Sequence, residues 1–242
     1  MLRLHYNLEK LSTGLVLGII IAASIGGFVE IAPLFTIGET VERPADLRPQ
    51  TPLELAGREI YMREGCYACH SQMVRSLADE IDRYGPYSRA GESAFDHPML
   101  WGSKRTGPDL ARVGGKYTDA WHVAHLTNPR AVVPASIMPA YPWLSEPLDT
   151  SGLGPELATM RRLGVPYDAA MIQAAETDAL AQSRPDSADA EGFRDRHGDR
   201  PVVRAFDGSV ARVTEMDALV AYIQSLGQLT AIAHDQPPAD GE

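Results

Sequence analysis

The chain has 242 residues, two cysteines and a formal net charge of -10, a length that suits one soluble domain plus a membrane anchor. Hydrophobic residues make up 44% of the sequence, which is enough for a packed core. The acidic balance and the lack of a Lys/Arg run argue against a nucleic-acid-binding protein.

The first predicted element is a transmembrane helix. Residues 11–29 contain no charged side chain and, as a helix, would span roughly 28 Å, close to the hydrocarbon thickness of a bilayer. A cleaved signal peptide is the alternative, but its apolar core would be shorter and a small-residue cleavage site would follow. We therefore predict an uncleaved, single-pass anchor over residues 11–36.

The charges around this anchor predict its orientation. Basic residues precede it and acidic residues follow it, namely Arg3 and Lys10 before, and Glu39, Glu42 and Asp46 after. The positive-inside rule then places residues 1–10 in the cytoplasm and the rest of the chain on the opposite side of the membrane. Residues 37–52 contain three prolines and read as a linker.

A helix and a haem-attachment motif follow. Leu53, Gly57 and Tyr61 recur at helical spacing within a predicted helix over residues 53–64. The next segment, residues 66–70, reads Cys-Tyr-Ala-Cys-His. Two thiols at this spacing can add to the two vinyl groups of haem, and the following histidine can bind the iron. The motif predicts one covalent haem c on Cys66 and Cys69, with His70 as an axial ligand. A redox Cys-x-x-Cys or half of a zinc site are the alternatives.

Residues 96–105 form a long loop that holds Trp101 and Arg105. It is either a surface loop with one packed aromatic side chain or a docking loop that binds a haem propionate. Arg105 would make the charge-assisted bond to that propionate.

Two further segments lie beyond residue 143. After about residue 181 the chain becomes rich in Asp, Arg and Ala, and we expect a flexible surface excursion there. A last helix is predicted over residues 214–226. Thr214 is its N-cap and Asp217 completes a capping box, while Gly227 ends it.

The soluble part resembles a class I cytochrome c. The residues that carry this resemblance are Gly57, Tyr61 and Tyr222, which match the family's crossing of first and last helices, and the Gly-Pro-x-Leu segment at residues 107–110. The resemblance implies that the Pro108 carbonyl accepts a hydrogen bond from the proximal histidine and that Leu110 lines the haem pocket.

Met138 is the predicted sixth ligand of the iron. It lies in a proline-rich run, with Pro134 and Pro139 on either side, that resembles the family's distal-ligand loop. Met99 is a rival, and His97, His122 and His125 are rival histidine ligands. A Met/His pair raises the haem potential relative to His/His and leaves no open position for a substrate.

Longer stretches resemble the mono-haem subunit II of cbb3-type cytochrome c oxidases. They include residues 29–35, 65–72, 83–88, 101–110 and 138–143. The resemblance implies a subunit in the bacterial cytoplasmic (inner) membrane, with its cytochrome domain on the periplasmic side. Its partners would be a di-haem cytochrome c subunit and a catalytic subunit with haem b, haem b3 and copper.

The same resemblance implies several roles. Electrons would pass through this subunit to the catalytic subunit, which reduces oxygen to water, so this chain would have no catalytic residue of its own. Trp101 and Tyr141 would line the haem pocket. A calcium site at the subunit interface is also suggested, to which Gly102 and Ser103 would contribute oxygen ligands.

The expected fold is all-α, with one transmembrane helix and a class I cytochrome c-like domain with long loop insertions. The expected segments are a cytoplasmic terminus at 1–10, the anchor at 11–36, the linker at 37–52, the cytochrome domain at 53–230 with an insertion at 144–213, and a disordered tail at 231–242. Three other functions stay open: a freestanding membrane-anchored electron carrier, the cytochrome subunit of a nitric oxide reductase, and a haem sensor or peroxidase.

Overall fold

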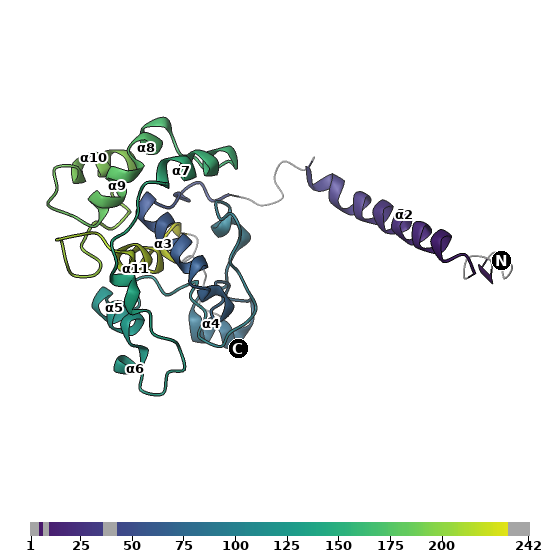
Figure 1. The fold of residues 1–242 in the computed structure, drawn as a ribbon, viewed down its shortest axis with the longest axis horizontal. Helices are drawn as coiled ribbons and strands as arrows, with labels where there is room; N and C mark the ends of the chain where they lie inside the picture. The colour runs from purple at the N-terminus through teal and green to yellow at the C-terminus, as the bar shows by residue number, and fades with distance from the viewer. Residues whose placement is uncertain (1–4, 7–9, 36–42, 232–242) are drawn as a thin grey trace. The chain divides into compact units, whose positions relative to one another are not determined.

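The computed structural model describes residues 5–6, 10–35 and 43–231, and the chain divides into two compact units, Met1–Glu42 and Arg43–Glu242 (Figure 1). Four of the predicted segments fall partly outside the described residues. These are the cytoplasmic terminus (1–4 and 7–9), the end of the anchor with the start of the linker (36–42), and all but the first residue of the tail (232–242).

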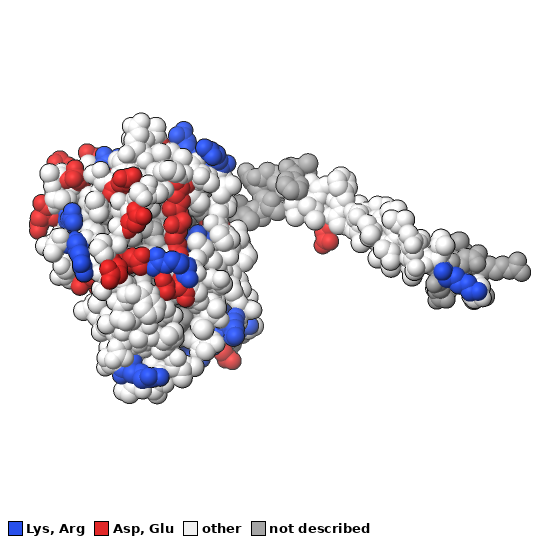
Figure 2. Space-filling model, in the orientation of Figure 1, with Lys and Arg blue, Asp and Glu red and all other residues white. Residues whose placement is uncertain are grey.

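The first unit contains one long apolar helix. Helix α2 covers Ser12–Ile31 and continues into the short 3-10 helix η1, Ala32–Phe35. The span Ser12–Leu34 has a mean hydropathy of 2.3, and none of it is buried. Its surface is white over most of its length in Figure 2, because Glu30 is the first charged residue after Lys10. A helix that is apolar on every side suggests a single-pass membrane anchor.

The second unit is helical, and the described residues contain no β-strand beyond one isolated bridge between Pro147 and Thr214. Its first and last helices are α3 (Pro52–Arg63) and α11 (Glu215–Ser225). Both begin with a capping box, formed by Thr51 with Glu54 and by Thr214 with Asp217. These boxes satisfy amide groups that have no partner inside the helix. The predicted helices are therefore confirmed, including the N-cap at Thr214.

Helices α3 and α11 pack across each other through a glycine. A Cβ atom on Gly57 would lie 1.9 Å from the carbonyl oxygen of Ala218 and 2.8 Å from Cβ of Tyr222. The rings of Tyr61 and Tyr222 meet edge to face, with centroids 5.5 Å apart, and both side chains are buried. The backbones can approach this closely because position 57 has no side chain. The helix crossing of a class I cytochrome c-like domain is thus present.

Short elements and loops connect these two helices. In chain order they are η2 (Cys66–Ala68), α4 (Ala78–Tyr84), η3 (Ala90–Ser93), α5 (Asp119–Thr127), α6 (Pro129–Val132), η4 (Pro142–Ser145), α7 (Leu153–Arg162), α8 (Ala169–Gln173), α9 (Ala175–Gln182) and α10 (Ala190–His197). The predicted insertion at residues 144–213 carries helices α7 to α10, and long loops lie between η2 and α5.

The segment after residue 181 is folded, and the prediction of a flexible surface excursion there is wrong. Helix α10 buries Phe193 completely, and Asp178 on α9 accepts hydrogen bonds from Arg196 and His197. Aromatic stacking joins Phe193 to His197 at 4.8 Å between centroids. A single aromatic residue and one buried carboxylate organise this charged stretch. Composition, which averages over the segment, did not reveal them.

The linker prediction also needs an adjustment. Leu47, Gln50 and Thr51 are buried, and the Arg48 guanidinium pairs with Glu54 at 2.7 Å. Tyr167, from the predicted insertion, donates a hydrogen bond to the Gln50 carbonyl at 2.8 Å. The folded unit therefore begins before residue 53.

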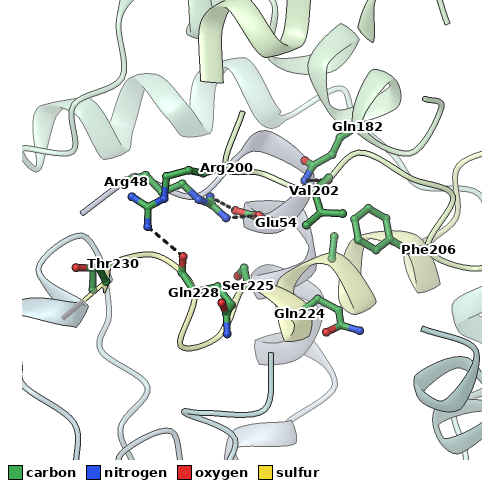
Figure 3. Close-up of a pocket in the computed structure, with 12 residues that line it drawn as sticks. Arg48, Glu54, Gln182, Arg200, Val202, Phe206, Gln224, Ser225, Gln228 and Thr230 are labelled. Carbon is green, nitrogen blue, oxygen red and sulfur yellow. Dashed lines mark hydrogen bonds and ion pairs between the residues drawn. The ribbon is translucent and has the colours of Figure 1, made fainter. Parts of the chain in front are cut away.

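A cavity of about 270 Å³ lies where the predicted insertion meets α3 and α11 (Figure 3). Arg48 and Glu54 pair on one side of it, and Arg200 donates a hydrogen bond to the Gln228 carbonyl on another. The predicted haem-binding residues are not among the residues that line it. This cavity is separate from the candidate functional site.

Candidate functional site

The Cys-x-x-Cys-His motif forms one tight turn after α3. Gly65 has a φ of +72°, which releases the chain from the helix, and the short helix η2 follows. The amides of Cys69 and His70 both donate to the Cys66 carbonyl, at 3.1 and 2.9 Å. Both thiols are free. The turn thus carries two thiols and an imidazole on five consecutive residues.

The two thiols differ in their surroundings. Cys66 packs against the hydrophobic core, whereas Cys69 is exposed. Burial, with a smaller contribution from Glu64, raises the pKa of Cys66 to about 11. Redox-active cysteines of Cys-x-x-Cys motifs have a lowered thiol pKa. The raised pKa disfavours a reactive thiolate at Cys66.

The ring of His70 is held in one orientation. Its Nδ1–H donates to the carbonyl oxygen of Pro108 at 2.8 Å, which directs the other ring nitrogen, Nε2, to a ligand. A Cβ atom on Gly107 would lie 2.3 Å from Cε1 of this ring. The glycine of the Gly-Pro-x-Leu segment is therefore required for the imidazole to pack against the backbone.

Met138 lies in the loop that follows α6. Its side chain is half-buried against the core, and its amide bonds to the Ser136 hydroxyl at 3.2 Å. The loop is pinned where the Tyr141 amide donates to the Leu126 carbonyl at 2.8 Å. Its neighbour Ile137 is 77% exposed, so consecutive side chains of this loop lie in different environments.

Tyr141 links this loop to the haem motif. The pKa of its hydroxyl is raised by burial and then by the nearby Cys66 and Cys69. The structure thus brings the Met138 loop and the cysteine pair to the same part of the molecule, although more than 60 residues separate them in the sequence.

His125, a rival ligand, also lies near this site. Its pKa is lowered by burial and then by the nearby His70. Its ring stacks on Trp121 at 4.6 Å, and Trp121 in turn stacks on Tyr117 at 4.1 Å. This column of three rings, two of them on α5, fixes the His125 imidazole in place.

Residues 96–105 are tied to the haem motif by hydrogen bonds. The Trp101 carbonyl accepts from the Gln72 amide at 2.8 Å, and its indole donates to Ser93 at 3.0 Å. Arg105 donates to Ser71 at 2.7 Å and pairs with Glu80 at 2.6 Å. The pairing of Arg105 with a haem propionate stays a prediction.

The remaining predicted residues lie nearby. Leu110 is half-buried against the core and its amide donates to the Ser71 carbonyl at 2.8 Å. Gly102 and Ser103 are exposed. Over the described residues, no group of three or more His, Cys, Asp or Glu side chains is arranged to hold a metal ion. A calcium ion at Gly102 and Ser103, which stays a prediction, would need other oxygen ligands.

Sequence reasoning missed Asp109 and Ser71. Both are buried beside His70, and their side chains are joined by a hydrogen bond of 2.6 Å. One feature of the sequence could have revealed Asp109. It is a charged residue at the variable position of Gly-Pro-x-Leu, between residues that were expected to pack against haem.

Together these residues fit one haem c. They supply two free thiols and an imidazole whose Nδ1 is already hydrogen-bonded. They also supply a glycine backbone against which the imidazole packs, and a half-buried thioether in a neighbouring loop.

Comparison with known families agrees with this fit. The family of cytochrome c oxidase mono-heme subunits, FixO, matches residues 5–230. The chain belongs to this family. It is therefore the mono-haem cytochrome subunit of a cytochrome c oxidase, a complex that contains other subunits. Among curated proteins, no match to the chain is found.

Proposed function

We propose that this subunit binds one haem c covalently through Cys66 and Cys69, and that His70 and Met138 are the axial ligands of its iron. The bound haem would supply a one-electron redox couple. We propose further that electrons pass from a di-haem cytochrome c subunit through this one to a haem b/b3–copper subunit. That subunit would reduce oxygen to water, as in a cbb3-type oxidase.

The observation that carries the proposal is the hydrogen bond from His70 Nδ1 to Pro108, with Gly107 against the ring. A bonded Nδ1 fixes the tautomer and makes Nε2 a better donor to iron. A thioether on the opposite side would complete the coordination. Because no position would stay open for oxygen, its reduction belongs to a partner. This disfavours a haem sensor or peroxidase.

The surface around Met138 suits contact with a redox partner. Residues 131–145 contain no charged side chain, and in Figure 2 the end of the unit with α5 and α6 is mostly white. Ile137 and Trp143 are 77% and 48% exposed there. Exposed apolar side chains near a cofactor favour close approach of another protein.

The anchor supports a permanent place in a membrane complex. We propose the bacterial cytoplasmic (inner) membrane, with the cytochrome unit on the periplasmic side, since Lys10 precedes α2 and acidic residues follow it. The family match favours the oxidase over a nitric oxide reductase. Whether the subunit acts in a complex or as a freestanding carrier can be tested directly.

When the complex is purified in a mild detergent through a tag on this chain, b-type haem and oxygen-consuming activity should co-purify with a c-type haem spectrum. Reduced-minus-oxidised spectra and an oxygen electrode measure the two signals. If crosslinking in intact membranes also captures no b-type haem protein, the chain is a freestanding carrier and the oxidase assignment of its partners is wrong.

Covalent attachment predicts a specific defect in Cys66→Ala. This variant should retain a single thioether bond, through Cys69, because each thiol can saturate one vinyl group. Mass spectrometry of the haem peptide and an alkaline pyridine spectrum report the number of bonds. Cys69→Ala is the matched control and should retain the other bond. A Cys66→Ala chain with two thioether bonds would contradict the assignment.

A further inference from the structure

The carboxylate of Asp109 is buried directly behind the proximal histidine. Its side chain is 1% exposed. One oxygen, Oδ2, accepts from the Ser71 hydroxyl at 2.6 Å and from the Met73 amide at 2.9 Å. The other, Oδ1, accepts from the Ala111 amide at 2.8 Å. A buried carboxylate with three short hydrogen bonds is held rigidly.

Its charge is compensated by a small cluster of ion pairs. Arg105, whose side chain is 16% exposed, lies 3.5 Å from Oδ2 of Asp109 and 2.6 Å from Glu80. Arg75 also pairs with Glu80. Two guanidinium groups thus face two carboxylates, and burial of an unpaired charge, which would cost several kcal/mol, is avoided.

Backbone hydrogen bonds join residues 69–71 to residues 107–110 on either side of His70. The amide of Gly107 donates to the Cys69 carbonyl at 2.9 Å, and the amide of Leu110 donates to the Ser71 carbonyl at 2.8 Å. The hydrogen bond from His70 to Pro108 lies between these two backbone bonds, because His70 is between Cys69 and Ser71 and Pro108 is between Gly107 and Leu110. Asp109 adds side-chain bonds that prevent the segments from sliding relative to each other.

We propose that Asp109, supported by Ser71 and Arg105, is a positioning residue that holds the Pro108 carbonyl on the His70 ring and so sets the reduction potential of the haem. The inference rests on the haem site proposed above. A firm Nδ1–H bond increases the basicity of the ring and stabilises the ferric state. A negative charge near the iron acts in the same direction.

Asp109→Asn is the first test, because the amide has nearly the same shape. It puts an NH₂ donor where the native carboxylate accepts bonds from amides and a hydroxyl, and it removes the charge. At a fixed ambient potential the ratio of reduced to oxidised haem should rise by about tenfold, which is 59 mV for a one-electron couple. The full-length subunit, loaded with haem, is titrated by spectroelectrochemistry.

Two further variants separate positioning from charge and from folding. Asp79→Asn on α4 makes the same chemical change at an exposed site and should leave the potential unchanged. Ser71→Ala removes one donor to Asp109 without a charge change and should also raise the potential. In the reduced subunit, the Nδ1 proton of His70 should exchange faster with solvent in both Asp109→Asn and Ser71→Ala, as measured by NMR.

The outcomes are distinct. If Asp109→Asn and Ser71→Ala both keep the native potential and the native exchange rate of the Nδ1 proton, Asp109 has a purely structural role and the inference is overturned. The same conclusion follows if Asp109→Asn shifts the potential but Ser71→Ala changes neither quantity, because charge alone would then account for the effect. If Asp109→Asn does not load haem, Ser71→Ala decides by the same criteria. A wild-type chain without covalent haem would instead refute the proposed function.

Discussion

Met138→Ala should lower the haem reduction potential and allow carbon monoxide to bind the reduced subunit. The thioether is the proposed sixth ligand, and its loss would open a coordination position. Axial ligands move haem potentials over roughly 0.8 V, so we expect a decrease larger than the about 59 mV that corresponds to a tenfold change. Spectroelectrochemistry and a carbon monoxide titration measure the two effects.

Met99→Ala is the control for this experiment, since Met99 is the rival thioether. Its side chain is 43% exposed, and its replacement should change neither quantity. If Met99→Ala opens the site and Met138→Ala does not, the ligand assignment is wrong. If neither does, a histidine such as His125 becomes the candidate, because its imidazole lies near His70.

Gly57→Ala should destabilise the cytochrome unit by roughly 2 kcal/mol or more, because the added methyl group overlaps backbone atoms of α11. Overpacking of a core costs about 1–3 kcal/mol and occasionally more. Alanine would gain about 1 kcal/mol of helix propensity, which offsets part of this. At a contact of 1.9 Å with Ala218 the helices must move apart. Thermal unfolding of the full-length subunit, followed by circular dichroism, measures the effect.

Gly152→Ala provides the matched comparison. Gly152 has a φ of -92°, which any residue adopts, and no atom lies within 4 Å of an added Cβ. Gly152 is the N-cap of α7, where alanine is less favourable than glycine, so the same change should cost about 1 kcal/mol or less, clearly less than at Gly57. Equal midpoints for Gly57→Ala and Gly152→Ala would mean that the two helices are not in close contact.

The folded segment after residue 181 shows how composition can mislead. Its charged residue Arg196, on α10, pairs with Asp178 of the preceding helix α9. Low apolar content indicates disorder only when the charges remain solvated. Here one fully buried phenylalanine, Phe193, supplies the apolar contact around which the charges are arranged.

Features that depend on neighbouring residues could be predicted from the sequence. They are the apolar helix α2, the capping box at Thr214, and the turn that presents Cys66, Cys69 and His70. Each depends on residues within four positions of one another, or on the composition of one continuous stretch. Spacing along the chain therefore determines them.

Contacts between distant segments were decided by the tertiary structure. Asp109 reaches Ser71 across 38 positions, and Arg105 reaches Glu80 across 25. No periodicity records which polar groups will be buried together, since their partners are chosen by how the loops pack over α3 and α11. The sequence by itself predicted which residues would hold a haem. The packing of residues 96–111 against the histidine decided how firmly His70 is held.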